Sequence, residues 1–239
     1  MNPVLGEFLG TAVLVVLGDG VVAGVLLTKS KAKDAGWVAV TAGWAVAVLA
    51  GVLTARAVGA EGYVNPVGPF VAALTGSLSV ASAVQFAAAE VAGAFVGAVI
   101  VWLHYLPHWA ATPDPGVKLA VFATGPAVRL PAANLLSEAI ATFVLVLVGS
   151  AIGRVFVGHA DAAAPLGAAL VWGIGLSLGG TTGYAINPAR DLGPRLAHAL
   201  LPIPGKGPSD WGYAWVPVVG PLLGGGIGAM VAKAVFAPS

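Results

Sequence analysis

The sequence predicts an all-α membrane protein with six transmembrane helices and two short re-entrant helices, arranged as inverted repeats of three spans each. Its 239 residues are 58% hydrophobic and 9% charged, with a mean hydropathy of +0.93, whereas a soluble domain is about a quarter charged. A span needs about 20 apolar residues, and the chain holds several such runs. A repeated Asn-Pro motif also opens two apolar stretches that are too brief to cross a bilayer.

Six apolar runs separated by polar or proline-containing breaks are the expected spans. They cover about 4–27, 37–58, 82–104, 133–156, 165–179 and 212–236. We expect a lysine-rich turn after the first span, a long irregular connection at about 105–131, and shorter connections near 158–165 and 202–210. No Lys or Arg precedes the first run, so it is expected to be a retained span and not a cleaved signal peptide.

Two apolar pieces remain, at about 66–77 and 188–200, and they begin with Asn65-Pro66-Val67 and Asn187-Pro188-Ala189. As helices they would be about 18–20 Å long, a little over half of the hydrocarbon thickness. Asn is a good N-cap and Pro suits the first helical position, so each motif alone predicts only a capped helix start. Their matching places in the two halves favour a functional pair, re-entering where protein or a wet cavity surrounds the backbone.

The chain repeats itself. The run from Glu7 through Thr11 to Gly18 resembles the run from Glu138 through Thr142 to Gly149, with Glu, Thr and Gly at the same offsets. An Asn-Pro motif follows each copy. Because each half holds an odd number of spans, the second half has to be inverted relative to the first. We therefore expect a single channel domain over 1–239, with repeats at approximately 1–125 and 126–239.

Two half-helices that meet tip to tip would create a pore with a distinct chemistry. Each would direct the positive end of its dipole toward the midplane, and the amides of Asn65 and Asn187 would donate to a passing solute. Cations would be repelled, whereas neutral molecules with hydroxyl groups would accept these bonds. Arg190 lies one turn further along, and an arginine at membrane depth is a functional hypothesis by default. The alternative is a charge that snorkels to the interface.

The stretch Thr182-Gly-Tyr-Ala-Ile-Asn-Pro-Ala-Arg-Asp-Leu-Gly-Pro-Arg195, together with Glu7-Phe-Leu-Gly-Thr11, resembles the major intrinsic protein family of aquaporins and glycerol facilitators. The resemblance covers nearly the whole chain. It implies an aquaporin-like right-handed bundle with one pore per subunit, a homotetramer, and a multi-pass protein of the cell membrane. Within the family, the chain is most similar to the glycerol facilitator, or aquaglyceroporin, branch.

The resemblance also implies roles for individual residues. Water-selective members carry a histidine where this chain has Gly175, so a wider constriction is expected here. An ordinary packed tryptophan remains the alternative for Trp44. The expected sets are Asn65 and Asn187 at the pore centre, Trp44, Gly175, Tyr184 and Arg190 at the selectivity constriction, and Glu7, Glu138 and Asp191 as supports of the loops. Two departures from the family pattern are Val67, where Ala is usual, and Tyr63, where His is usual.

These observations predict a passive channel for glycerol and other small uncharged solutes, with some water, that excludes ions and protons. The alternatives are a channel mainly for water or hydrogen peroxide, and a secondary transporter with broken helices. The expected partners are these solutes, water, the lipid bilayer and further copies of the chain. With a net charge of +1, no nucleic-acid partner is expected. The chain has no cysteine and its histidines lack ligand spacing, so we expect no enzyme, cofactor or metal site.

Overall fold

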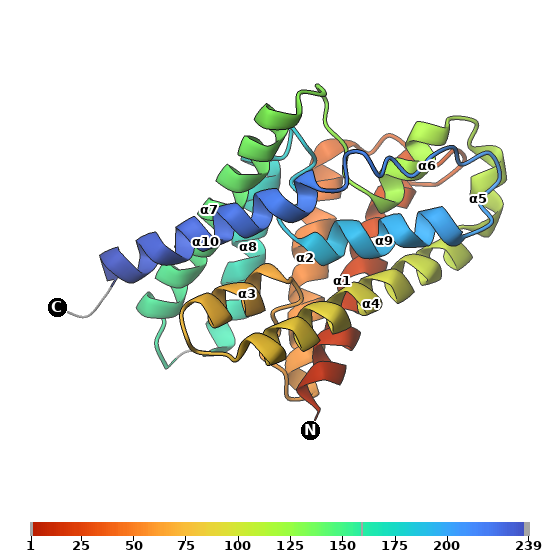
Figure 1. Cartoon of the computed structure of the whole chain (residues 1–239). Coiled ribbons are helices and arrows are strands. Elements are labelled where there is room, and N and C mark those ends of the chain that lie inside the picture. The colour runs from red at the N-terminus through yellow and green to blue at the C-terminus, as the bar shows by residue number, and fades with distance from the viewer. Residues whose placement is uncertain (1, 159, 237–239) are drawn as a thin grey trace.

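Six long helices build the body of the protein, as the sequence predicts. A computed structural model describes residues 2–158 and 160–236, and over these residues it contains helices and no strand. The six are α1 (Pro3–Leu26), α2 (Gly36–Ala57), α4 (Val80–His104), α7 (Pro131–Val155), α8 (Ala160–Leu178) and α10 (Val216–Phe236) (Figure 1). All but α8 are long and apolar enough to cross a membrane by length and composition, and the apolar part of α8 is the shorter Ala162–Leu178.

The boundaries of α8 and α10 differ from the expected ones. We expected a connection that ends at Pro165, but α8 already begins at Ala160 and holds Pro165 within its early turns. Pro165 is the sixth residue of α8, past the four N–H groups that lack an intrahelical partner, so it removes one backbone hydrogen bond without ending the helix. In the last span, residues 211–215 form turns, and α10 begins only at Val216.

Four short helices complete the fold. The half-helices are α3 (Val67–Leu74) and α9 (Pro188–Leu200). The first is shorter than expected, because 75–79 turn back toward α4; its 8 residues correspond to about 12 Å. The connection at 105–131 is not irregular throughout, since it contains α5 (Leu106–Ala111) and α6 (Pro115–Phe122). Both begin with a proline in their first two positions, a common helix start.

The two halves pack in equivalent ways. The first helix of each half, α1 or α7, contacts the second and third long helices of its own half, and α2 meets α8 between the halves. Both half-helices pack against α4 and also against α10, so each one bridges the two repeats (Figure 1). The tips of α3 and α9 are therefore held inside protein, the condition under which re-entrant segments are stable.

Glycines permit the closest helix contacts. A Cβ atom added to Gly93 would lie 2.1 Å from the Phe8 carbonyl oxygen, and one added to Gly224 would lie 2.0 Å from that of Ala139. Gly224 follows Gly93 by the same number of residues as Ala139 follows Phe8. The contact of α10 with α7 therefore repeats the contact of α4 with α1. Such small residues let helix backbones approach in lipid. The division of the chain near residue 125 stays a prediction.

Candidate functional site

The side-chain oxygens of both motif asparagines bind the helices that they open. Asn187 Oδ1 accepts hydrogen bonds from the backbone N–H groups of Ala189 and Arg190, at 3.0 and 3.1 Å. Asn65 Oδ1 accepts one from the N–H of Val67 at 3.1 Å. Because an amide has its oxygen and nitrogen on opposite sides, these caps fix each NH2 group facing away from its own helix.

The two amide groups bind the opposite repeat. Asn65 Nδ2 donates to the carbonyl oxygen of Ile186 at 2.9 Å, and Asn187 Nδ2 donates to that of Val64 at 2.8 Å. This reciprocal pair joins the tips of α3 and α9. Each NH2 carries two hydrogens, so one donor on each asparagine is left for a solute. Both asparagines line an internal cavity of about 160 Å³.

The residues before the asparagines adopt a strained backbone. Val64 has φ of 45° and Ile186 has φ of 44°, in the left-handed region that β-branched residues avoid. Such a conformation costs about 1–3 kcal/mol and persists only where the surroundings enforce it. The geometry turns their carbonyl groups toward the opposite asparagine, where the two reciprocal hydrogen bonds form.

Two buried glutamates hold these loops. Glu7 accepts hydrogen bonds from the N–H groups of Gly62, Tyr63 and Val64, at 2.8, 3.0 and 2.8 Å. Glu138 accepts from Ala185 and Ile186, both at 2.9 Å. Buried backbone N–H groups outside helices need such partners. The carboxylates therefore replace the missing secondary-structure partners and keep the strained residues in place.

Three of the expected constriction residues lie between two cavities. An outer cavity of about 450 Å³ is lined in part by Asp34 and Gly125. Trp44, Tyr184 and Arg190 line both this cavity and the inner one at the asparagines. The Arg190 guanidinium carbon lies 4.2 Å from the centre of the Trp44 ring. The level between the two cavities is thus lined by two aromatic rings and by a cationic hydrogen-bond donor that lies over one of them.

The fourth expected residue, Gly175, lines neither cavity. A Cβ atom there would lie 2.9 Å from Thr41 Cγ2 and from Tyr184 Cζ, so this glycine makes room for the tyrosine ring. Its carbonyl oxygen accepts a hydrogen bond from Trp37 Nε1 at 3.0 Å, and the Trp37 ring meets Tyr184 edge to face at 5.8 Å. Sequence reasoning missed Trp37, whose aromatic side chain at the start of the second span was the available signal.

Glycines also accommodate Trp44 and the unusual Val67. A Cβ at Gly18 would lie 2.2 Å from the Trp44 ring, and one at Gly225 would lie 2.5 Å from Val67 Cγ1. The extra bulk of Val67 relative to alanine is therefore taken up by α10. Tyr63, the second departure, lines the inner cavity and packs its ring against Phe86.

Asp191 ties α9 to the loop that follows α6. Its Oδ2 accepts from the N–H and the hydroxyl of Thr124, at 2.8 and 2.7 Å, and its Oδ1 accepts from Arg195 Nε at 2.8 Å. Arg195 in turn donates to the carbonyl oxygen of Thr124 at 2.9 Å. Asp191 therefore pairs with Arg195, and the guanidinium of the preceding Arg190 is left for the passage.

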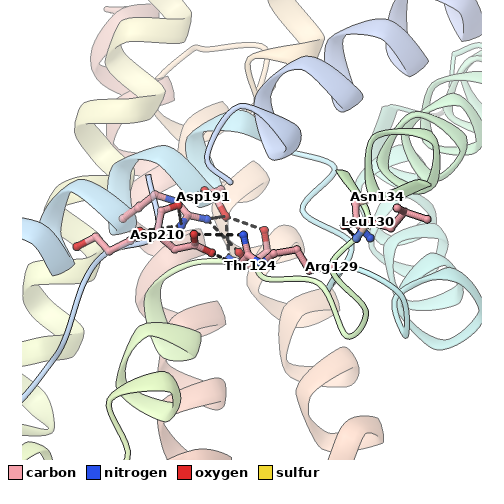
Figure 2. Close-up of polar contacts among 8 residues, drawn as sticks. Thr124, Arg129, Leu130, Asn134, Asp191 and Asp210 are labelled. Carbon is pink, nitrogen blue, oxygen red and sulfur yellow. Dashed lines mark hydrogen bonds and ion pairs between the residues drawn. The ribbon is translucent and has the colours of Figure 1, made fainter. Parts of the chain in front are cut away.

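Two further contacts extend this network in the outer loops. Figure 2 shows Asp191, Thr124 and the ion pair of Arg129 with Asp210 gathered at the junction of α9 with two loops. The hydrogen bond with Asp210 raises the pKa of Arg129. At the end of this loop, Asn134 in the first turn of α7 donates from Nδ2 to the Val128 carbonyl oxygen at 3.0 Å. These contacts order the segment between α6 and α7, which lines part of the outer cavity.

Two buried acids, Asp19 and Glu90, have no hydrogen-bond partner for either carboxyl oxygen within the described residues. Sequence reasoning gave them no role. Within residues 2–158 and 160–236, no group of three His, Asp or Glu side chains is placed to hold a metal ion. His159, one of the four histidines, lies outside the described residues.

Comparisons with known proteins agree with this geometry. The family model "Major intrinsic protein" matches residues 1–232. Glycerol uptake facilitator protein 3 of Lactiplantibacillus plantarum is 53% identical over 229 residues, covering 95% of this chain and 94% of the relative. A probable glycerol uptake facilitator protein of Thermotoga maritima is 52% identical over 238 residues, covering 99% of this chain and 100% of the relative.

A solved structure shares the whole architecture. The X-ray structure of the aquaglyceroporin from Plasmodium falciparum superposes with a TM-score of 0.84 at 26% identity, covering 98% of this chain and 96% of that chain. The agreement extends over six long helices and both half-helices of the expected aquaporin-like bundle. The chain therefore belongs to the major intrinsic protein family, as a multi-pass protein of the cell membrane.

Proposed function

We propose that this protein is a passive channel for glycerol and other small uncharged solutes, with some water, and that it excludes ions and protons. The observation that carries the proposal is the level between the two cavities, where Trp44 and Tyr184 offer aromatic surface and Arg190 offers cationic hydrogen-bond donors. A polyol is amphipathic in the same way. The relatives named as glycerol uptake facilitators, about half identical over nearly their full length, support this choice of solute.

In the proposed path, a glycerol molecule lays its CH groups against Trp44 and Tyr184 while its hydroxyl oxygens accept hydrogen bonds from Arg190. It then meets the free N–H groups of Asn65 and Asn187 in the inner cavity. Apolar side chains such as Leu14, Val48 and Val171 line much of that cavity, so part of its wall offers a solute no hydrogen bond. Bonds of this kind replace lost hydration without trapping the solute, which conduction requires.

Ion exclusion follows from the same groups. The arginine charge stands at the narrow level, and the N-terminal ends of α3 and α9 direct positive dipole ends to the asparagines. A cation that leaves water would meet donors and positive potential, with few acceptors. A neutral solute does not meet this electrostatic barrier.

We also propose that four copies assemble in the bilayer. Large apolar side chains are exposed along one side of α2, at Val38, Val46 and Leu53, which are 61%, 61% and 53% exposed in the single chain. In water such a face would be costly. Lipid tails and the faces of neighbouring copies are the apolar environments that can cover it.

A swelling assay tests the proposed function. Proteoliposomes holding the protein are mixed with excess glycerol or with an impermeant osmolyte, and light scattering records their volume. We expect shrinkage followed by re-swelling in glycerol, and shrinkage alone with the impermeant osmolyte. Vesicles that shrink in glycerol and never re-swell, while water flux is raised, would replace the polyol assignment by a water channel. Uptake that saturates and responds to a proton or sodium gradient would indicate a transporter.

A further inference from the structure

We propose that Glu90 is a positioning residue for the first Asn-Pro loop: it stays protonated and donates its proton to the Glu7 carboxylate. Three observations carry this inference, namely the burial of Glu90, its place beside Glu7, and a free acceptor site on Glu7. For the effect on flux, the inference rests on the proposed channel function.

Glu90 lies on the face of α4 that packs against the beginning of α1. One turn further along that face, Gly93 lies so close to α1 that an added Cβ would be 2.1 Å from the Phe8 carbonyl oxygen. Glu90 and Glu7 are both fully buried. The Glu90 carboxyl is near enough to the Glu7 carboxyl and the Asn65 backbone N–H to interact with both, although neither of its oxygens completes a well-formed hydrogen bond within the described residues.

Two adjacent buried carboxyl groups cannot both ionise at ordinary cost, so one of them holds a proton. Glu7 already accepts three backbone N–H bonds, whereas neither oxygen of Glu90 accepts a hydrogen bond within the described residues, so Glu90 is the acid with an oxygen available to hold the proton. A carboxylate has about four acceptor sites, so one site on Glu7 remains. A protonated Glu90 supplies the missing donor, which gives the buried Glu90 carboxyl a partner and fills the remaining acceptor site of Glu7.

The groups around Glu90 do not offer another counter-charge. Within the described residues, Glu7 of α1 is the ionisable group whose charge acts on Glu90, and Glu90 in turn acts on the Tyr63 hydroxyl of the loop. The half-helix α3 has no ionisable residue. From α9, the ionisable side chains bind or face other groups: Asp191 and Arg195 bind each other, His198 binds Ser209, and Arg190 stacks on Trp44.

The second repeat provides an internal comparison. The close contact of Gly93 with Phe8 in the first repeat is matched by that of Gly224 with Ala139 in the second. The same sequence offset between the repeats makes Pro221 the counterpart of Glu90. The position beside Glu138 that matches Glu90 therefore carries a proline and no acid. The proton-dependent support belongs to the Asn65 loop alone, which is the loop held by three backbone bonds to its glutamate.

The test uses the full protein with Glu90 changed to Gln, which keeps a donor, or to Leu, which cannot donate. Infrared spectra at neutral pH should show one fewer protonated carboxylic acid band in both variants than in the wild type. Asp19→Asn removes another fully buried, unpartnered acid and serves as the matched control, because it should leave the Glu90 band in place. This readout does not depend on glycerol flux, so failure of the proposed function would not be mistaken for failure of this inference.

Flux measurements provide the second arm. Glu90→Leu should lower glycerol permeability several-fold, and Glu90→Gln should restore it. Wild-type permeability should fall on the alkaline side as the shared proton is lost, whereas the Gln variant should show no such fall. An unchanged set of acid bands in Glu90→Gln would overturn the inference. So would an alkaline fall in that variant identical to the wild type; this comparison remains decisive if the Leu variant does not fold.

Discussion

A substitution at Gly18 tests the role of Trp44 in the constriction, because Gly18 packs against the Trp44 ring and lines neither cavity. In Gly18→Ala the new Cβ would lie 2.2 Å from Trp44 Cζ3 and 2.4 Å from two further ring atoms. Carbon atoms prefer separations of about 3.5–4.0 Å, so the indole has to move by more than about 1 Å. Overpacking of this kind costs about 1–3 kcal/mol, and the better helix propensity of alanine returns about 1 kcal/mol. We therefore expect a net loss of about 0–2 kcal/mol of stability.

The larger expected effect is on selectivity. The Arg190 guanidinium stacks on the Trp44 ring, a cation–π contact worth about 0.5–2 kcal/mol. A displaced ring would therefore change the shape of the proposed constriction and the position of Arg190. Glycerol permeability of Gly18→Ala should drop several-fold, with a smaller drop for water, in stopped-flow measurements on proteoliposomes. Gly20→Ala is the matched control on the same helix, since nothing lies within 4 Å of its added Cβ. Equal glycerol-to-water ratios in the two variants would refute the reasoning.

Two further predictions concern the outer support and the tyrosine wall. Asp191→Asn leaves the fully buried Arg195 without its carboxylate partner and should lower the free energy of unfolding by about 3–5 kcal/mol. The loss is measured as a lower thermal unfolding midpoint in detergent. The control is Asp34→Asn, which breaks an exposed ion pair and should lower the free energy of unfolding by less than about 1 kcal/mol. Equal shifts in the two variants would contradict the assignment. Gly175→His should reduce glycerol flux far more than water flux, because the imidazole collides with Tyr184 and pushes it into the passage; equal losses of both fluxes would count against this.

The sequence contains enough information to predict the membrane class, the spans and the two half-helices. Apolar runs predict burial in lipid, and the Asn-Pro motif predicts a helix start. Both features can be predicted because they depend on residues that are close together in the sequence. The boundaries of α3 and α8 were less predictable. Helix α3 ends at Leu74, where Thr75, Gly76 and Ser77 turn the chain back before the expected end at 77. Helix α8 begins before a proline that usually marks a break.

Contacts between distant segments could not be predicted from the sequence. Nothing local to Thr124 indicates that it binds Asp191, and nothing local to Gly175 indicates that its role is to make room for Tyr184. These partners depend on how helices from both halves come together. The carboxylates of Glu7 and Glu138 were expected at the loops from the resemblance, but the strain at Val64 and Ile186 that they hold became visible only in the structure.

The most direct test of the account is an experimental density map of the protein in glycerol, in a lipid membrane. The account predicts density for glycerol at the level of Arg190 and again beside Asn65 and Asn187, with the two half-helices joined by their asparagine amides. A map in which either half-helix lies at the membrane surface, or in which no passage runs between the two asparagines, would contradict it.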